Sequence, residues 1–167
     1  MIREAVVSDA EEILALTRRV EEESSFMLYG AGERNSSLES MKKMLETFAE
    51  KKNATIFVAE RDNRLVGYLI VNGGEARRLE HSAYIVIGIV SSYQGKGIGS
   101  ALFSEMEKWA RRNSIHRLEL TTAVPNEAGV ALYRKAGFEI EGIKKDSMRI
   151  SGEFINEYYM AKLLDSE

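Results

Sequence analysis

Three glycines at alternate positions, Gly95, Gly97 and Gly99, lie where an apolar run of the sequence gives way to an amphipathic one. Glycine adopts left-handed backbone at little cost, and its missing side chain lets a ligand approach backbone N–H groups closely. The first N–H groups of a helix have no internal partner, and the helix dipole places partial positive charge on them. We therefore expect a buried strand, a bare turn and a helix that binds an anion such as phosphate, with Lys96 adding charge at the rim.

Composition narrows the class of protein. The 167 residues fit one ordinary domain, so we expect a single domain over 1–167. Hydrophobic residues make up 44% of the chain and charged residues 29%, as in soluble globular proteins. The net charge of -3 argues against a nucleic-acid partner, because dedicated binders are strongly basic. The absence of cysteine excludes disulfides, thiolate catalysis and cysteine-based metal sites, and we expect no metal.

The sequence shows no targeting or membrane-spanning segment. Its first residues, MIREAVVSDAEE, lack the apolar core of a signal peptide. The longest strongly apolar run, Tyr84 to Val90, is far too short to cross a bilayer. We therefore expect a cytoplasmic protein with no membrane partner.

Periodicity and turn chemistry predict the order β-α-α-β-β-β-α-β-α-β-β. Capping boxes at Ser8–Glu11 and Ser36–Glu39 are expected to open the first two helices. Turn residues predict hairpins at 61–64 and 151–152. The order predicts an α/β (α+β) fold with a mixed, mostly antiparallel sheet of about six or seven strands flanked by four helices. Strands are expected at 2–7, 55–60, 65–71, 82–90, 117–122, 138–149 and 154–163, and the later helices at 98–112 and 126–136.

Three phosphate-binding patterns compete for the glycine stretch. The nucleoside-triphosphate loop requires Ser or Thr directly after its lysine, and Lys96 is followed by glycine. The dinucleotide fingerprint G-x-G-x-x-G is one residue longer than the spacing found here, and no βαβ unit surrounds it. A third pattern, [RQ]-x-x-G-x-[GA], is met by Gln94, Gly97 and Gly99. A glycine-rich turn that binds nothing is the remaining alternative.

Two segments carry a resemblance to a known family. IGIVSSYQGKGIGSALFSEMEKWA resembles the pyrophosphate loop of the GNAT superfamily of N-acetyltransferases. PNEAGVALYRKAGFEIEGI is similar to the second motif of that family, N-x-x-A-[IV]-x-L-Y-x-x-x-G-F. The order, the spacing and the predicted elements agree, so the resemblance covers essentially the whole chain, nearest the polyamine and ribosomal-protein branches. The chain departs from the family at Gly129, where alanine is usual, and at Gln94, where arginine is commoner.

The resemblance implies a single N-acetyltransferase domain that binds acetyl-CoA and passes its acetyl group directly to an amine. The backbone of Ile87 to Ile89 would bind the pantetheine arm, and an N–H near Ile89 would polarise the thioester carbonyl. Gly88 would ease either a bulge or a close approach in this strand. The coenzyme diphosphate would lie on the backbone N–H groups of Gln94, Gly95, Lys96, Gly97, Ile98, Gly99 and Ser100.

Two side chains of the second motif are candidates for cofactor contacts. Asn126 would bond the pantetheine amide region, and it is also suited to cap the helix that follows Pro125. Tyr133 lies about two helical turns further on the same face and is the expected catalytic residue, donating to the departing thiolate. The alternative for Tyr133 is an ordinary core tyrosine.

The general base is left open by the sequence, as is the acceptor. Thr121 stands where relatives that acetylate ribosomal-protein N-termini often carry Glu, which argues mildly against that subclass. A water chain is the alternative to a side-chain base. The titratable candidates on or beside the strands are Glu60, Glu80, His81, Tyr84 and Glu119.

The acceptor is expected opposite the cofactor, bordered by the loop at 24–35 and the C-terminal hairpin. The apolar run 26–29 beside Glu33 and the acidic run 21–23 indicates either a pocket for a cationic amine or simple loop covering of the sheet. The expected partner is a small-molecule amine or a peptide N-terminus. The alternatives are a protein N-terminal acetyltransferase, a non-catalytic acyl-CoA sensor and an enzyme acting on charged transfer RNA. A homodimer is a further expectation, by analogy with relatives.

Overall fold

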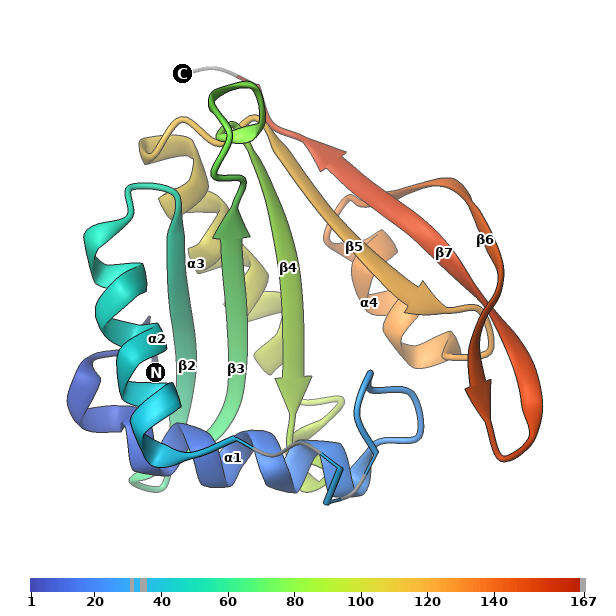
Figure 1. Ribbon diagram of the computed structural model, residues 1–167, viewed down its shortest axis with the longest axis horizontal. Helices are drawn as coiled ribbons and strands as arrows, with labels where there is room; N and C mark the ends of the chain where they lie inside the picture. Colours follow the sequence, from blue (N-terminus) through green and yellow to red (C-terminus); the bar gives the residue numbers. More distant parts are fainter. Residues whose placement is uncertain (31, 34–35, 166–167) are drawn as a thin grey trace.

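A computed structural model describes residues 1–30, 32–33 and 36–165 of the chain. Figure 1 shows a twisted sheet with helices packed against it. In this part of the chain the strands are β1 (Ile2–Glu4), β2 (Ala54–Arg61), β3 (Arg64–Gly73), β4 (Ser82–Ile89), β5 (Arg117–Ala123), β6 (Glu139–Ile150) and β7 (Glu153–Leu163). The α-helices are α1 (Ala10–Glu23), α2 (Leu38–Glu50), α3 (Ile98–Arg112) and α4 (Glu127–Lys135).

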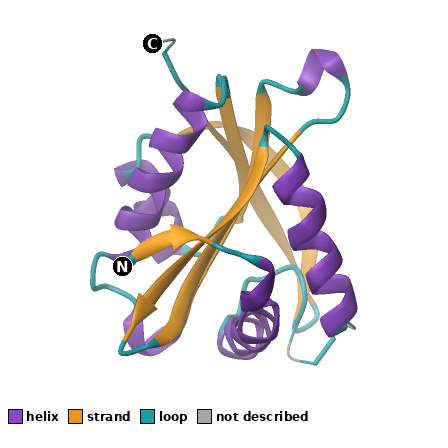
Figure 2. Cartoon of the chain, turned by 90° about the vertical axis from the view of Figure 1, so that its left-hand side faces the viewer, coloured by secondary structure: helices purple, strands orange, loops and turns teal. Residues whose placement is uncertain are grey.

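The described strands form one seven-stranded sheet in the order β1-β2-β3-β4-β5-β7-β6. Strands β4 and β5 are parallel, whereas the other neighbouring pairs are antiparallel. Figure 2, turned by 90°, shows helices on both faces of this sheet. The predicted α+β fold and its order of elements are therefore confirmed.

Each face of the sheet has its own hydrophobic core. Helix α3 packs against one face through residues such as Leu102 and Met106, and α4 adds Leu132 and Tyr133 to the same cluster. Helices α1 and α2 cover the other face through residues such as Ile13 and Leu45. We call these the α3/α4 face and the α1/α2 face. Successive side chains of a strand point to opposite faces, so each strand residue can be assigned to one of them.

Strands β4 and β5 separate soon after they begin. Their register runs only from Ser82↔Arg117 to Tyr84↔Glu119. Beyond this point β5 stays paired with β7 along its length, while β4 stays paired with β3. The two halves of the sheet consequently diverge, as Figure 1 shows, and beyond Tyr84 no described strand pairs with the inner edge of β4. We call this opening the gap.

The N-terminal predictions need correction. The first strand ends at Glu4 rather than at 7, because Asp9 accepts a hydrogen bond from the Val6 N–H (2.8 Å) and draws 7–9 into a 3-10 turn. Asp9 also binds the Arg3 guanidinium through both carboxylate oxygens, at 2.8 and 2.9 Å. The predicted Ser8 cap is therefore wrong, and α1 follows Asp9 without a side-chain cap bond.

The second capping box lies one residue later than predicted. The Ser37 hydroxyl accepts from the Ser40 N–H, and the Ser40 hydroxyl accepts from the Ser37 N–H, both at 3.1 Å. Serine thus replaces the expected glutamate as the reciprocal partner. Both predicted hairpin turns are confirmed, with positive φ at Asp62 and Asn63 and again at Ser151 and Gly152.

Candidate active site

The glycine stretch forms a bare turn at the N-terminus of α3. Gly95 has φ of +72° and Gly97 has φ of +84°, in the left-handed region where other residues are strained. Gly97 is the N-cap residue of α3. No heavy atom of the described residues lies within 4 Å of a Cβ placed on either glycine, so the space in front of the turn is open to them. The predicted need for glycine at these positions is confirmed.

The turn presents a row of unpaired backbone donors. The first backbone bond of α3 runs from the Ala101 N–H to the Gly97 carbonyl, at 3.0 Å. Among the described residues, no backbone carbonyl accepts from the N–H groups of Gly95 through Ser100. The Gln94 N–H differs, because it donates to the Ser91 carbonyl at 3.2 Å. Together with the helix dipole, the donors from Gly95 onward can hold an anion.

Two side chains of the turn are tied to its surroundings. The Gln94 side-chain amide donates to the Ile89 carbonyl at 3.1 Å, which fixes the turn to the end of β4. The Lys96 ammonium lies 5.2 Å from the ring centre of Tyr93, within the range of a cation–π contact. Lys96 is otherwise exposed, so its charge remains available at the rim of the turn.

Strand β4 directs alternate backbone N–H groups into the gap. The Val90 N–H donates to the Val66 carbonyl of β3, at 2.9 Å. Antiparallel pairing alternates along a strand, so the even-numbered residues of β4 bond to β3 and the odd-numbered ones face the other way. The N–H groups of Ile87 and Ile89 therefore point into the gap, beside the phosphate-type turn. Their own side chains pack on the α3/α4 face.

Gly88 permits a close approach between two strands. A Cβ at this position would lie 2.6 Å from the Tyr68 ring, a distance that real Cβ atoms do not show. The register of β3 and β4 runs without a shift through Gly88, so the suggested bulge is not found there. The close-approach interpretation of this glycine is the correct one.

Asn126 caps α4, and Gly129 makes room for it. The Asn126 side-chain oxygen accepts from the Gly129 N–H at 3.2 Å. A Cβ on residue 129 would lie 2.4 Å from the Asn126 side-chain nitrogen. The glycine that departs from the family pattern thus lets this side chain fold tightly over the first turn of the helix.

Tyr133 is half-buried on α4, facing the core that α3 shares. Its ring packs edge-on against Phe103 and Phe138, with centroids 6.0 and 6.5 Å apart. Its hydroxyl has no hydrogen-bond partner among the described residues. Burial, and to a lesser degree the Tyr84 phenol, raise the pKa of Tyr133 to about 12. The group is therefore a neutral donor that no described residue satisfies.

A groove of about 570 Å³ continues from the bare turn between α3 and α4. It begins at Ser100 and reaches Arg112. The Arg111 guanidinium binds Glu107 at 2.9 Å, whereas Arg112 and Lys135 have no ion pair among the described residues. The groove is lined by Ser100, Phe103, Ser104, Glu107, Lys108, Arg111, Arg112, Lys135 and Ala136, so positive charge outnumbers negative.

A smaller hollow of about 140 Å³ lies where β4 and β5 part. The Tyr84 hydroxyl and the Thr121 hydroxyl bond one another across the strands at 2.8 Å. Tyr84 and Tyr159 are 42% and 45% exposed, so their rings stand open to solvent. Alternation along the strands places these three side chains on the α1/α2 face, opposite Tyr133. The lining residues are Tyr84, Arg117, Glu119, Leu120, Thr121, Tyr159 and Met160.

The structure separates the five titratable base candidates. Only Tyr84 and Glu119 line the hollow. Glu60 binds Arg3 at 2.7 Å on the β1–β2 side of the sheet. Glu80 and His81 are exposed and precede β4 rather than lying along the gap.

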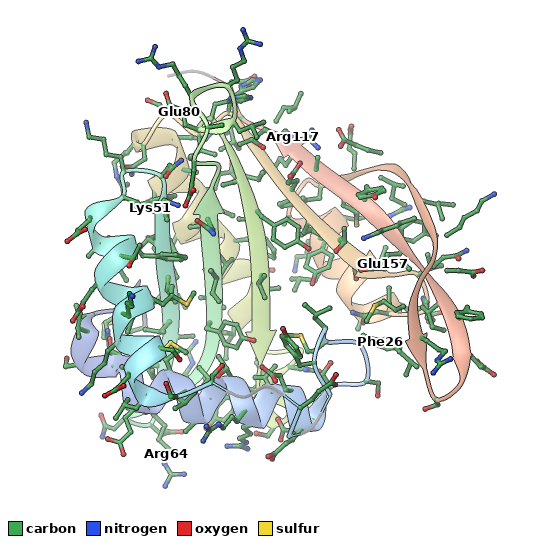
Figure 3. The ribbon with its side chains drawn as sticks, in the orientation of Figure 1. Phe26, Lys51, Arg64, Glu80, Arg117 and Glu157 are labelled. Atoms are coloured by element: carbon green, nitrogen blue, oxygen red, sulfur yellow. The ribbon has the colours of Figure 1, made fainter. Side chains whose placement is uncertain are left out.

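Glu157 is a candidate that the sequence did not single out. It is half-buried on β7, where its Cα pairs with that of Ala123 at the end of β5. No hydrogen bond or ion pair involves its carboxylate within the described residues. Figure 3 shows Arg117 where β4 and β5 meet and Glu157 further along the sheet, on the side toward Phe26. No sequence motif marks Glu157. Only its position, two residues before Tyr159 on the same face of β7, places it on the side of the hollow.

The loop between α1 and α2 lies beside the C-terminal end of β4, toward the wide end of the gap (Figure 1). Phe26 and Met27 are half-buried, and Leu28 is 76% exposed. The Glu33 carboxylate accepts from the Gly30 N–H at 2.8 Å. Glu23 accepts from the Ser91 N–H at 3.0 Å, which lowers the pKa of Glu23. Glu23 and Glu33 thus hold backbone groups, and residues 31 and 34–35 of the predicted loop lie outside those described.

Two features are absent from the described residues. No helix there is long and apolar enough to span a membrane. No group of three or more His, Asp or Glu side chains in the same residues is placed to hold a metal ion.

Comparison with known proteins identifies the family. Residues 18–138 match the profile described as the Acetyltransferase (GNAT) family. The chain is 34% identical over 122 residues to the L-amino acid N-acetyltransferase AaaT of Escherichia coli K12, covering 71% of this chain and 74% of that protein. It is 36% identical over 95 residues to the N-alpha-acetyltransferase RimI of Mycobacterium tuberculosis, covering 56% and 58%.

A solved structure agrees with this assignment over the whole chain. An acetyltransferase of the GNAT family from Streptococcus pneumoniae superposes with a TM-score of 0.94 at 32% identity, covering 99% of each chain. The chain therefore belongs to the GNAT acetyltransferase family and is an acetyl-CoA-dependent N-acetyltransferase.

Proposed function

We propose that this protein, acting as one N-acetyltransferase domain, transfers the acetyl group of acetyl-CoA to the primary amine of a small molecule. One observation carries the proposal: the open left-handed turn at Gly95 and Gly97 lies beside the unpaired edge of β4. A ligand with a diphosphate and an extended amide-bearing arm can satisfy both sets of donors at once. Coenzyme A has this combination of groups, so the residues present fit it.

Different residues bind different parts of the coenzyme. The N–H groups from Gly95 through Ser100 hold the diphosphate, while Ile87 and Ile89 offer donors to the arm and to the thioester carbonyl. A donor aimed at that oxygen stabilises the negative charge that develops there, and loss of one such donor costs about 3–4 kcal/mol in other acyl-transfer enzymes. The groove between α3 and α4, where positive side chains outnumber negative ones, suits the charged adenosine end of coenzyme A. When bound at this site, the coenzyme would supply an activated acetyl group and a thiolate leaving group.

Tyr133 acts as a hydrogen-bond donor to the departing sulfur. A thiol has a pKa of about 8.5, and Tyr133 has a pKa of about 12. Full proton transfer to the thiolate is uphill by that difference, roughly 5 kcal/mol at about 1.4 kcal/mol per unit. A hydrogen bond without transfer stabilises the leaving group and keeps the phenol neutral. Water then supplies the proton that the thiolate takes up.

The amine approaches from the α1/α2 face, through the hollow between Tyr84 and Tyr159. An amine with a pKa near that of lysine, about 10.4, must lose a proton before it attacks. Glu119 and Glu157 are the nearby carboxylates, and the paired hydroxyls of Tyr84 and Thr121 can pass a proton to water. We assign the removal of the amine proton to these side chains acting together with solvent.

One other function has specific support, and a second fits the site less well. Similarity to RimI favours acetylation of a protein N-terminus. Against it, Thr121 stands where such relatives often carry Glu, and its hydroxyl is engaged by Tyr84. A non-catalytic acyl-CoA sensor on the same fold has no use for the unpartnered Tyr133 hydroxyl.

A thiol-release assay tests the proposed function. The purified chain with acetyl-CoA is screened against polyamines, amino acids, other small amines and peptide N-termini. We expect saturable release of coenzyme A with at least one small amine and slower release with peptides. Binding of coenzyme A without release on any amine supports the sensor, and faster release with peptides supports the protein acetyltransferase.

A further inference from the structure

The hollow on the α1/α2 face contains one cation, and that cation is already engaged. The Arg117 Nε donates to a Glu119 carboxylate oxygen at 2.9 Å. Its two terminal nitrogens donate to the two oxygens of Glu141, at 3.0 and 2.6 Å. This fork-to-fork geometry is the strongest form of an arginine–carboxylate pair. The guanidinium edge that could bind a ligand carboxylate is therefore occupied by Glu141.

A local irregularity brings Glu141 to this position. The register of β6 against β7 shifts between Ile140 and Gly142, so Glu141 has no cross-strand partner. A bulge of this kind re-aims the side chain of the extra residue. Here it carries the carboxylate across β7 to Arg117 of β5. The strand register thus sets the position of Glu141, and the pair itself lies at the protein surface, with the Arg117 and Glu141 side chains 27% and 45% exposed.

The charge that remains in and beside the hollow is negative. Arg117, Glu119 and Glu141 together carry one net negative charge. Glu157, half-buried on the same face, adds another and makes no ion pair within the described residues, and its exposed cross-strand neighbour Lys144 of β6 is the cation beside it. Counted together, these five side chains still carry one net negative charge. The other polar groups lining the hollow are hydroxyls, from Tyr84, Thr121 and Tyr159. An ammonium group is attracted to such a site, whereas a carboxylate beside it finds no free cation among the described lining residues.

We infer that the acceptor is an amine that carries no carboxylate next to its amino group. This inference rests on the proposed function and narrows it, because free α-amino acids are then poor acceptors. A like charge about 6 Å from a carboxylate at the protein surface weakens binding on the order of tenfold. Decarboxylated amines are thus distinguished from their parent amino acids by the electrostatics of Glu119, Glu141 and Glu157.

Matched pairs of ligands test the inference without requiring turnover. Isoamylamine is compared with L-leucine, and agmatine with L-arginine, by calorimetric titration into the chain saturated with coenzyme A at pH 7. The members of each pair differ by the carboxylate alone, and their amines are protonated at this pH. We expect the decarboxylated member of at least one pair to bind at least tenfold more tightly. Equal or tighter binding of the amino acids, or no saturable binding of either amine, overturns the inference.

A variant locates the discrimination at the arginine. Glu141→Gln removes the negative charge that neutralises the outer edge of Arg117 and leaves only a weaker, neutral acceptor there, so the preference for the decarboxylated member is expected to shrink at least threefold. Glu153→Gln, an exposed carboxylate at the start of β7, is the matched control and keeps the preference. A preference that Glu141→Gln leaves unchanged also counts against the inference.

The outcomes separate this inference from the proposed function. Preferential binding of the amines without thiol release on any acceptor supports the inference and removes the proposed function. Thiol release with free amino acids at rates equal to those of the matched amines retains the function and removes the inference.

Discussion

Replacing Tyr133 with phenylalanine removes one hydroxyl and leaves the ring in place. The contacts with Phe103 and Phe138 are between rings and do not involve the oxygen. The hydroxyl has no partner among the described residues, so its loss leaves no other group unsatisfied. We therefore expect the free energy of unfolding to change by less than about 0.5 kcal/mol.

The expected effect on turnover is much larger. A hydrogen bond to a charged group contributes about 1.5–3 kcal/mol. Because Tyr133 donates only when the sulfur becomes negative, this contribution is lost from the transition state and not from the bound ground state. At about 1.4 kcal/mol per tenfold change, kcat falls about 10- to 150-fold, while affinity for acetyl-CoA changes by less than about threefold.

Three measurements test this prediction together. Steady-state thiol release gives kcat, calorimetry gives coenzyme affinity, and urea unfolding gives stability. Tyr158→Phe is the matched control, because Tyr158 is also half-buried against the same core cluster. Unchanged kcat in Tyr133→Phe refutes the assigned role. A parallel loss of stability and activity would instead mean that the hydroxyl supports the fold.

Three further predictions concern pH, the glycine turn and the N-terminal ion pairs. Since the pKa of Tyr133 is about 12, activity is expected to show no alkaline loss up to about pH 10.5. A loss of activity with a midpoint near pH 10, present in the native protein and absent in Tyr133→Phe, contradicts this. Gly97→Ala places a side chain at φ of +84°, which is expected to cost about 1–2 kcal/mol in stability and to weaken coenzyme binding at least tenfold. The control Gly152→Ala, at φ of +80° in a distant hairpin, is expected to cost similar stability and to leave coenzyme binding intact. Equal losses of coenzyme binding in the two variants refute the site. The Arg3 hydrogen bonds hold the pKa of Asp9 below its usual range, so the stability that Asp9 contributes is present above about pH 4 and is lost as pH falls through the lowered folded-state value. Asp9→Asn is accordingly expected to cost about 1–3 kcal/mol at pH 7 and to flatten the acid limb of stability against pH, and an unaltered acid limb contradicts the assignment.

Local chemistry made much of the fold predictable. Gly95 and Gly97 need left-handed backbone, and the turns at 61–64 and 151–152 contain the residues that such turns require. The apolar run before the glycine turn predicted a buried strand, and β4 indeed lies inside the sheet, between β3 and β5. These features are set by neighbouring residues, so the sequence is sufficient to show them.

Long-range pairing explains what the sequence did not show. Asp9 left the predicted capping pattern because Arg3, itself held by Glu60 of β2, binds its carboxylate. In the candidate site, the position of Glu141 depends on a register shift between β6 and β7 that no sequence signal marks. Glu157 likewise is recognised as a candidate only from the pairing of β7 with β5. Strand register between distant segments decides each of these cases.

Amide hydrogen exchange of β4 and the glycine turn tests the central claim most directly. Without ligand, the N–H groups of Ile87 and Ile89 face the gap and are expected to exchange quickly, whereas Val90, bonded to Val66, is protected. Saturation with coenzyme A is expected to slow exchange at Ile87 or Ile89 and across Gly95 to Ser100, with Val90 unchanged. Saturating binding that leaves these amides exchanging as before would contradict the account.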